Sequence, residues 1–313
     1  MPRCLMPRCL LPRHLRPSPH ARTAPTIPQM PTHFADALHQ RLAAGASPIC
    51  VGLDPVLDKI PPTLRAEHPA PADAIHHFSR GVIDSIRGLA PAVKFQSACY
   101  ERHASQGVAA LEASMRYARD AGLLVILDAK RGDIGISSEH YAAAAANAGA
   151  HAITLSGYLG PSTIAPFLAS GLAVFVLVRT SNPDSDVVQA QRLADGRTVA
   201  EMMADLVHTL GASHLSTRGQ SSVGAVVGAT KAAEAAALRA RMPNQIFLIP
   251  GYGAQGGTAS DVRAMLTPSR QGILVTASRS VIYPQANSGE DWASAINRAA
   301  KSFAAEIATV ITG

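Results

Sequence analysis

The 313-residue sequence contains few aromatic residues, few lysines and no long hydrophobic run. Aromatic residues make up only 4% of the chain, whereas hydrophobic residues make up 47%, so Ala and branched aliphatic side chains are expected to dominate the core. The longest apolar runs have the length of a strand, far below the roughly 18 residues of a membrane-spanning helix. We therefore expect a soluble protein that does not enter a membrane; the cysteines, considered next, favour the reducing cytoplasm.

Cysteine is scarce as well, with four residues at Cys4, Cys9, Cys50 and Cys99. No pair has the CxxC spacing that is typical of a zinc site. Cys50 lies in an apolar run and Cys99 follows another. Both are therefore predicted to be reduced, buried residues rather than disulfide partners.

The net charge of +6 is concentrated at one end of the chain. Residues 1–31 contain five arginines and no acidic residue, so the rest of the chain carries 6 − 5 = +1. A nearly neutral body predicts no nucleic-acid-binding face.

Residues 1–31 are also rich in proline and repeat the pentapeptide MPRCL in tandem. Prolines at this density prevent a stable helix, so we expect a disordered leader followed by a single domain over residues 32–313. The favoured explanation of the leader is that translation starts at Met30. A functional tail and a targeting segment remain alternatives.

From residue 34 onward, short apolar strands alternate with helices, and eight such pairs follow a first helix over residues 34–44. The strands are expected at residues 48–53, 92–95, 123–128, 152–156, 173–178, 223–227, 246–249 and 272–276. Ser137 is the expected N-cap of the helix that follows the third strand. Eight β/α units in about 280 residues predict an α/β fold, a closed (β/α)₈ TIM barrel.

Catalytic sites of such barrels lie at the carboxyl ends of the strands, and polar residues cluster at those ends here. The segment LLVILDAKRGDIG, residues 123–135, places Asp128, Lys130 and Asp133 within six residues after a buried strand. If the strand geometry persists, Asp128 and Lys130 point to the same side. An exposed salt bridge without chemistry is the alternative.

The positions of two lysines favour a catalytic site over a simple surface salt bridge. The chain has five lysines against 23 arginines, and two of the five, Lys94 and Lys130, end strands. A compact ammonium group can approach a reacting atom and release a proton, which arginine does not do. Chance placement is the alternative.

The last two strand ends have the character of a phosphate site. The glycine-rich loop at residues 250–257 exposes backbone N–H groups, and Arg279 follows the eighth strand with a planar set of donors. The combination predicts a phosphate site where many barrels hold one.

These motifs together resemble the orotidine 5′-phosphate decarboxylase family, and in particular its longer-chain bacterial subgroup. The segment DAKRGDI at residues 128–134 resembles the family's DxKxxDI motif. The segments GLDP at 52–55, VKFQ at 93–96, VVGAT at 226–230, PGYGAQGG at 250–257 and Ser278-Arg279 follow in the family's order. The resemblance covers about residues 33–311.

The resemblance implies that the protein decarboxylates orotidine 5′-phosphate to uridine 5′-phosphate, in de novo pyrimidine biosynthesis, without a cofactor or metal. Asp128, Lys130, Asp133 and Lys94 would form an alternating charge array, in which Lys130 protonates C6 of the pyrimidine. The implied substrate contacts are Asp54 and Lys94 at the ribose, Ser181 at the pyrimidine, and Gln255 and Arg279 at the phosphate.

Asp133 and Ile134 would reach into the site of a partner subunit, so the resemblance also implies a homodimer with shared sites. A magnesium-dependent sugar-phosphate decarboxylase or aldolase is the nearest alternative, but it would need a carboxylate where Lys94 stands. A non-catalytic nucleotide-binding barrel and an RNA-associated protein are more distant alternatives. Activity that survives deletion of residues 1–29 would argue against the last.

Overall fold

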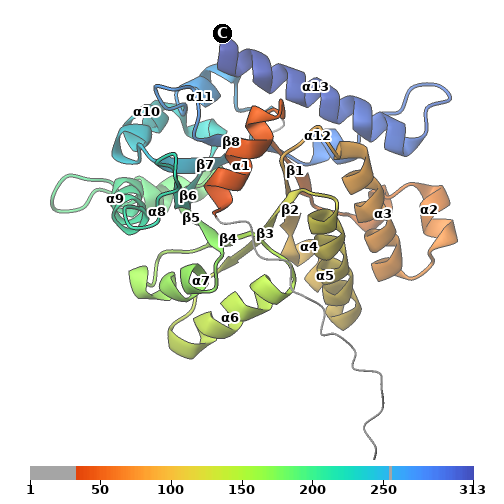
Figure 1. Cartoon of the computed structure of the whole chain (residues 1–313), viewed down its shortest axis with the longest axis horizontal. Helices are drawn as coiled ribbons and strands as arrows, with labels where there is room; N and C mark the ends of the chain where they lie inside the picture. The colour runs from red at the N-terminus through yellow and green to blue at the C-terminus, as the bar shows by residue number, and fades with distance from the viewer. Residues whose placement is uncertain (1–32, 254–255) are drawn as a thin grey trace, which may run out of the picture. The chain divides into compact units, whose positions relative to one another are not determined.

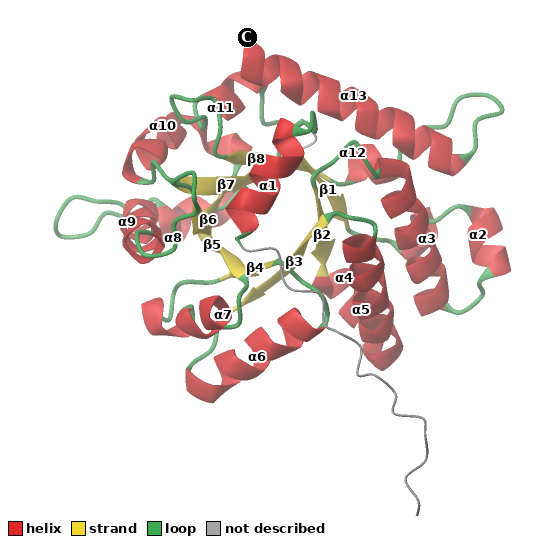
Figure 2. Cartoon of the chain, in the orientation of Figure 1, coloured by secondary structure: helices red, strands yellow, loops and turns green. Residues whose placement is uncertain are grey.

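The computed structural model describes residues 33–253 and 256–313, which form a closed barrel of eight parallel strands. Each strand pairs with the next along the chain, and β8 pairs with β1, so the sheet has no free edge. Figure 2 shows the ring of strands with helices around it. The strands are β1 (Ile49–Leu53), β2 (Ala92–Gln96), β3 (Leu124–Arg131), β4 (Ala152–Leu155), β5 (Ala173–Arg179), β6 (Ser221–Val227), β7 (Gln245–Ile249) and β8 (Ile273–Ala277).

Helices connect the strands on the outside of the barrel, as the alternating sequence pattern predicts. The α-helices are α1 (Phe34–Ala43), α2 (Pro62–Glu67), α3 (Pro71–Ile86), α4 (Ser97–Glu101), α5 (Ala104–Asp120), α6 (Gly135–Asn147), α7 (Ala165–Ala169), α8 (Asp186–Gln189), α9 (Val199–Gly211), α10 (Ala232–Arg241), α11 (Ala259–Arg263), α12 (Arg279–Ile282) and α13 (Trp292–Thr312). The (β/α)₈ prediction is therefore confirmed.

The strands are buried on both faces because one face packs inside the barrel and the other against helices. Short and branched side chains such as Ala92, Ile126 and Leu274 fill the interior together with Phe175. A second, larger apolar cluster lies between the sheet and the helices. The scarcity of aromatic residues suits this arrangement, since small side chains allow helices to approach the sheet closely.

Helix α1 lies across the amino-terminal end of the barrel (Figure 1). Its buried face, which includes Phe34 and Leu38, belongs to the same apolar cluster as the barrel interior. The Phe34 ring meets the Phe175 ring edge to face at 5.7 Å. The amino-terminal end is thereby closed, which leaves the carboxyl ends of the strands for a site.

Two local expectations differ from the structure, the Ser137 N-cap and the end of the third strand. Ser137 is not an N-cap: α6 already begins at Gly135, and its N-cap residue Ile134 makes no side-chain cap. β3 also continues to Arg131, three residues beyond the predicted end, so only residues 132–134 separate it from the helix. Short helices such as α4 and α8 also occur between the strands, where one turn is too short to show a hydrophobic period in the sequence.

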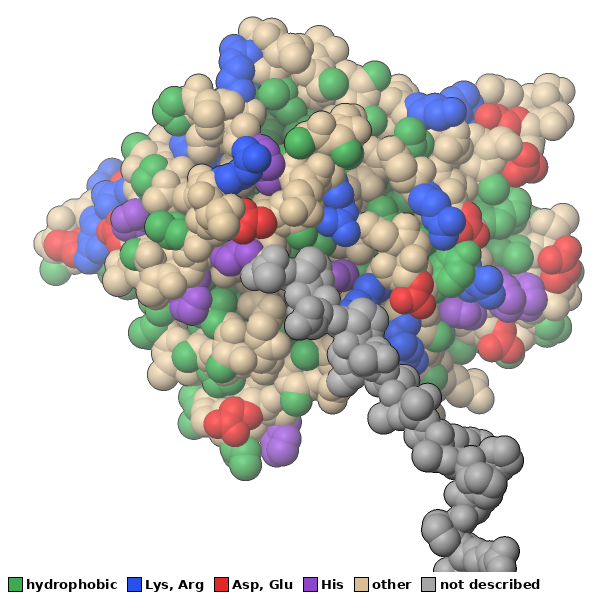
Figure 3. Space-filling model, in the orientation of Figure 1, with side chains coloured by type: hydrophobic (Ala, Val, Ile, Leu, Met, Phe, Trp, Pro, Cys, Tyr) green, Lys and Arg blue, Asp and Glu red, His purple; other side chains and the backbone are tan. Residues whose placement is uncertain are grey.

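The surface carries mixed charge. On the face in Figure 3, basic and acidic side chains are interspersed. No helix in the described ranges is long and apolar enough to cross a membrane. The predicted leader, residues 1–31, lies outside the described residues, so its disorder stays a prediction.

Candidate active site

A cavity of about 520 Å³ opens at the carboxyl ends of the strands. Six predicted site residues line it, from five different strand ends and the loops after them: Asp54, Lys94, Asp128, Lys130, Ser181 and Arg279. The size is typical of a small-molecule site. The structure thus brings together residues that are up to 225 positions apart (279 − 54) in the sequence.

Asp128 is the centre of the polar contacts in this cavity. One carboxylate oxygen, Oδ1, accepts hydrogen bonds from Lys130 Nζ at 2.6 Å and from the Thr154 hydroxyl at 2.9 Å. The other, Oδ2, accepts from Lys94 Nζ at 2.7 Å and from Gln96 Nε2 at 3.3 Å. Four hydrogen-bond donors therefore fix the orientation of the Asp128 carboxylate.

The charges in this array are stabilised by one another. Burial raises the pKa of Asp128, but the ammonium groups of Lys94 and Lys130 outweigh burial and lower that pKa to about 2. Burial lowers the pKa of Lys94, but Asp128 and Asp54 more than compensate and raise it above its usual range. Asp128 and Lys94 are therefore both ionised at neutral pH, although each is only 7% exposed.

Lys130 reaches the cavity from an unusual backbone conformation. Its φ of 47° lies in the left-handed region, which costs a non-glycine residue about 1–2 kcal/mol. The register of β3 against β4 shifts between Leu127 and Arg131, so the strand is irregular at this point. The expectation that Asp128 and Lys130 point to the same side assumed regular strand geometry, which does not persist at Lys130, although both side chains line the cavity.

Asp54 contributes a carboxylate oxygen that accepts no hydrogen bond from the described residues. Its Oδ1 lies 3.6 Å from Lys94 Nζ, is buried, and has no hydrogen-bond partner among the described residues. A buried carboxylate oxygen in this state is suited to accept a hydrogen bond from a ligand hydroxyl.

Asp133 and Ile134 do not line the cavity of this chain. Asp133 Oδ1 accepts a hydrogen bond from the backbone N–H of Ile134, and the Ile134 side chain is 65% exposed. Ile136 and Tyr158 are also large exposed apolar residues. The two predicted site residues therefore lie outside the cavity of their own chain, with Ile134 exposed and Asp133 half-buried.

The loop after β5 supplies Ser181 to the cavity. Its backbone passes close to Gly228 at the end of β6, where a Cβ atom would lie 2.9 Å from Ser181 Cα. Glycine is required for this approach. Arg179, the last residue of β5, does not line the cavity and pairs instead with Glu234 and Asp186 at 2.8 and 2.5 Å.

The predicted phosphate contacts are described only in part. Arg279 lines the cavity from the first position of α12. Gln255 lies outside the described residues. Sequence reasoning also missed Gln96, Thr154, Thr180 and Gln189, which line the same cavity. The sequence held a signal for Thr154, because it is the one hydroxyl-bearing residue within the otherwise apolar strand AITL.

No cluster of three or more His, Cys, Asp or Glu side chains that could hold a metal ion occurs in residues 33–253 and 256–313. The body cysteines of the described part, Cys50 and Cys99, are free; Cys50 is fully buried and Cys99 partly so. What the cavity offers to a ligand is two ammonium groups, one guanidinium group and two carboxylates.

Comparisons with known proteins agree on one family. A profile described as the orotidine 5′-phosphate decarboxylase / HUMPS family matches residues 47–291. The chain is 41% identical over 274 residues to the orotidine 5′-phosphate decarboxylase of Variovorax paradoxus, which covers 86% of this chain and 96% of that protein. It is 38% identical over 267 residues to that of Rhodopirellula baltica, with 80% and 88% covered. The solved structure of Leishmania donovani OMP decarboxylase has a TM-score of 0.74 and 33% identity, with 90% and 99% covered.

Proposed function

Because the chain belongs to the orotidine 5′-phosphate decarboxylase family, we propose that its cavity binds orotidine 5′-phosphate and that Lys130 protonates C6 of the pyrimidine. The protein is an enzyme of pyrimidine biosynthesis that converts orotidine 5′-phosphate to uridine 5′-phosphate. The observation that carries the residue assignment is the Lys94–Asp128–Lys130 array, which lines the same cavity as Arg279.

In the proposed reaction, the substrate carboxylate lies beside Asp128 and Lys130. The bond between C6 and the carboxyl carbon breaks, its electron pair remains on C6, and carbon dioxide leaves. A proton moves from Lys130 Nζ to C6 and forms the new C–H bond, which leaves a neutral amine that regains a proton from water. The ammonium group of Lys130 stabilises the charge that develops on C6, an effect that is strongest where water is excluded.

The other groups would bind the parts of the substrate that do not react. The orphaned Asp54 Oδ1 and the Lys94 ammonium are suited to the ribose hydroxyls. Arg279 is suited to the 5′-phosphate, and Ser181 to the pyrimidine. Binding energy from the distant phosphate can then be used to position the ring. Gln255 remains a proposed phosphate contact on the resemblance alone.

Two further proposals concern the whole enzyme. We propose a homodimer in which Asp133 and Ile134 complete the partner's site. Their absence from the cavity of their own chain and the exposure of Ile134, Ile136 and Tyr158 support this proposal. We also propose a cytoplasmic location, supported by the free body cysteines.

The test is the loss of orotidine 5′-phosphate absorbance with purified enzyme and two variants. Lys130→Ala is expected to abolish turnover in a folded protein. Arg279→Ala is expected to raise KM by roughly 10- to 100-fold, as loss of a charged hydrogen bond worth about 1.5–3 kcal/mol implies. Near-normal turnover of Lys130→Ala would contradict the proposed mechanism.

The matched family model covers HUMPS proteins as well as orotidine 5′-phosphate decarboxylases. The magnesium-dependent sugar-phosphate enzyme considered as the nearest alternative is therefore tested separately. Lys94 Nζ lies 2.7 Å from Asp128 Oδ2, and its positive charge would repel an Mg²⁺ ion bound at that carboxylate. Turnover of orotidine 5′-phosphate is therefore expected to be unchanged by EDTA and by added Mg²⁺. Inhibition by EDTA that Mg²⁺ reverses would favour the alternative.

A further inference from the structure

The Thr154 hydroxyl connects two residues of the neighbouring strand. It accepts a hydrogen bond from the backbone N–H of Lys130 at 2.9 Å and donates one to Asp128 Oδ1 at 2.9 Å. Thr154 lies on β4 and is 1% exposed. A hydroxyl has a single proton, so its direction is set: the proton points to the carboxylate and a lone pair faces Lys130.

This contact occurs where the backbone of β3 is irregular. Lys130 has a φ of 47°, and the β3–β4 register shifts between Leu127 and Arg131. The Lys130 N–H therefore bonds to a side chain of β4 rather than to a strand carbonyl. Because the side chain of Lys130 begins at this backbone, the Thr154 hydroxyl helps to determine where Nζ lies.

The same hydroxyl also fixes the group that Lys130 contacts. Asp128 Oδ1 receives Thr154 and Lys130 Nζ, while Lys94 and Gln96 donate to Oδ2. Without the hydroxyl, Oδ1 would keep only Lys130 Nζ as a donor. The carboxylate could then rotate, and the Lys130 N–H would be left without a partner.

We propose that Thr154 is a positioning residue, which holds the Lys130 backbone and the Asp128 carboxylate so that Lys130 Nζ is directed at the reacting carbon. The inference rests on the proposed role of Lys130 as the proton donor. Thr154 supplies no proton to the substrate, and its effect is therefore on the chemical step rather than on substrate binding.

The experiment compares Thr154→Val, which keeps the shape and removes the hydroxyl, with Thr154→Ser, which restores it. In Thr154→Val, kcat is expected to fall roughly 10- to 100-fold, since small misplacements of a catalytic group have effects of this size. KM and the inhibition constant of uridine 5′-phosphate should stay within about threefold, because ribose and phosphate contacts are untouched. Thr154→Ser should keep kcat within about threefold of the unmodified enzyme.

Thr163→Val is the matched control. Thr163 is also a buried threonine whose hydroxyl donates to a backbone carbonyl, that of Gly160, but it does not line the cavity. Its kcat should remain within about twofold of the unmodified enzyme. If Thr154→Val does not fold, Thr154→Cys replaces it, because a thiol is a weak donor and acceptor and should lower kcat in the same direction.

Three outcomes would overturn the inference: a kcat in Thr154→Val equal to that of the unmodified enzyme, a loss expressed only in KM, or a loss that Thr154→Ser does not restore. Where Thr154→Cys has replaced Thr154→Val, an unchanged kcat in Thr154→Cys has the same meaning. Lys130→Ala, measured in parallel, separates this inference from the proposed function. An inactive Lys130→Ala together with a fully active Thr154→Val would leave Lys130 as the proton donor and remove Thr154 from the mechanism.

Discussion

At the scale of single residues, Asp128 illustrates how burial and charge compete. A carboxylate that is 7% exposed would be costly alone, but its four donors include two ammonium groups. Stability from this group is present above about pH 4 and is lost as pH falls toward about 2, because protonation removes the ion pairs. The charge array is therefore intact throughout the neutral range.

His151 is a second buried residue that lowers stability as pH falls, but over a higher pH range. Its Nδ1 accepts a hydrogen bond from the Val125 N–H at 3.0 Å, which requires an unprotonated nitrogen. Burial lowers its pKa to about 4, and the positive charges of Arg119 and Arg41 act in the same direction. In the unfolded chain a histidine binds a proton at a higher pH, near 6.5.

We therefore predict that His151 destabilises the fold as pH falls from about 6.5 to about 4, by on the order of 3 kcal/mol at most. The matched variant is His151→Asn, whose amide oxygen can accept the same N–H but does not titrate. Urea unfolding at about pH 7.5 and about pH 5 should show a larger loss for the unmodified protein than for His151→Asn. Equal losses in the two proteins would contradict this prediction.

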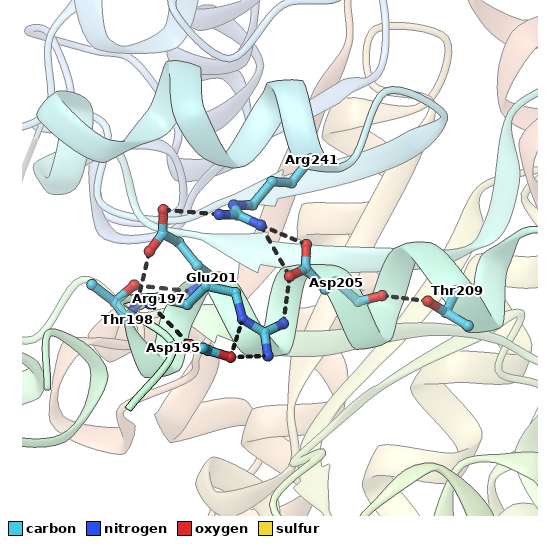
Figure 4. Close-up of polar contacts among 7 residues, drawn as sticks. All are labelled: Asp195, Arg197, Thr198, Glu201, Asp205, Thr209 and Arg241. Atoms are coloured by element: carbon cyan, nitrogen blue, oxygen red, sulfur yellow. Dashed lines mark hydrogen bonds and ion pairs between the residues drawn. The ribbon is translucent and has the colours of Figure 1, made fainter. Parts of the chain in front are cut away.

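At the scale of elements, a chain of ion pairs joins α9, α10 and the segment before α9 (Figure 4). Asp205 on α9 accepts from Arg197 at 2.7 Å and from Arg241 on α10 at 2.9 Å. Arg241 also pairs with Glu201, whose side chain completes a capping box with Thr198. The side chains are a quarter to a half exposed, so each ion pair alone contributes little to stability. A larger contribution is expected from the network, in which Asp205 pairs with two arginines at once.

Asp205→Asn is predicted to lower the free energy of unfolding by about 1 kcal/mol, because it weakens contacts to two arginines at once. The effect should shrink at about 1 M NaCl, where exposed charges are screened. The control is Asp120→Asn at the exposed end of α5, which should change stability by less than about 0.5 kcal/mol. Urea denaturation measures both, and equal effects would show that the Asp205 contacts contribute nothing.

Elements also show where sequence reasoning succeeds and fails. The strands were predictable because a strand that is buried on two faces appears in the sequence as about five consecutive apolar residues, as in Leu123–Leu127. The ends of elements were not, since the extension of β3 to Arg131 depends on pairing with β4. Arg179 stands at the end of β5, where site residues of a barrel are expected, but it pairs with Glu234 and Asp186 and does not line the cavity. Its partner Glu234 lies in a helix 55 residues later in the sequence.

At the scale of the whole molecule, the proposed dimer predicts complementation between two inactive variants. Lys130→Ala retains Asp133 for its partner, and Asp133→Ala retains Lys130 in its own cavity. A mixed dimer then contains one complete site, so refolding the two together should restore about a quarter of normal activity. Turnover measured at equal concentrations tests this, with each variant alone as the control.

If the mixture is no more active than the separate variants, Asp133 does not act in the partner's site. If Asp133→Ala alone retains near-normal turnover, the residue is dispensable in either chain. Size-exclusion chromatography of both variants shows whether either substitution prevents association, which keeps loss of the dimer distinct from loss of the site.

The sequence by itself determined the eight β/α units, the closure expected of that number, and the local motif that places Asp128 and Lys130 two residues apart. These follow from short-range periodicity and spacing. Only the tertiary structure decided that the Thr154 hydroxyl contacts both of them, that Lys130 takes a left-handed backbone conformation, and that Arg179 is buried away from the cavity. Such contacts join different strands and helices, and their geometry exists only once the barrel has closed in its particular register.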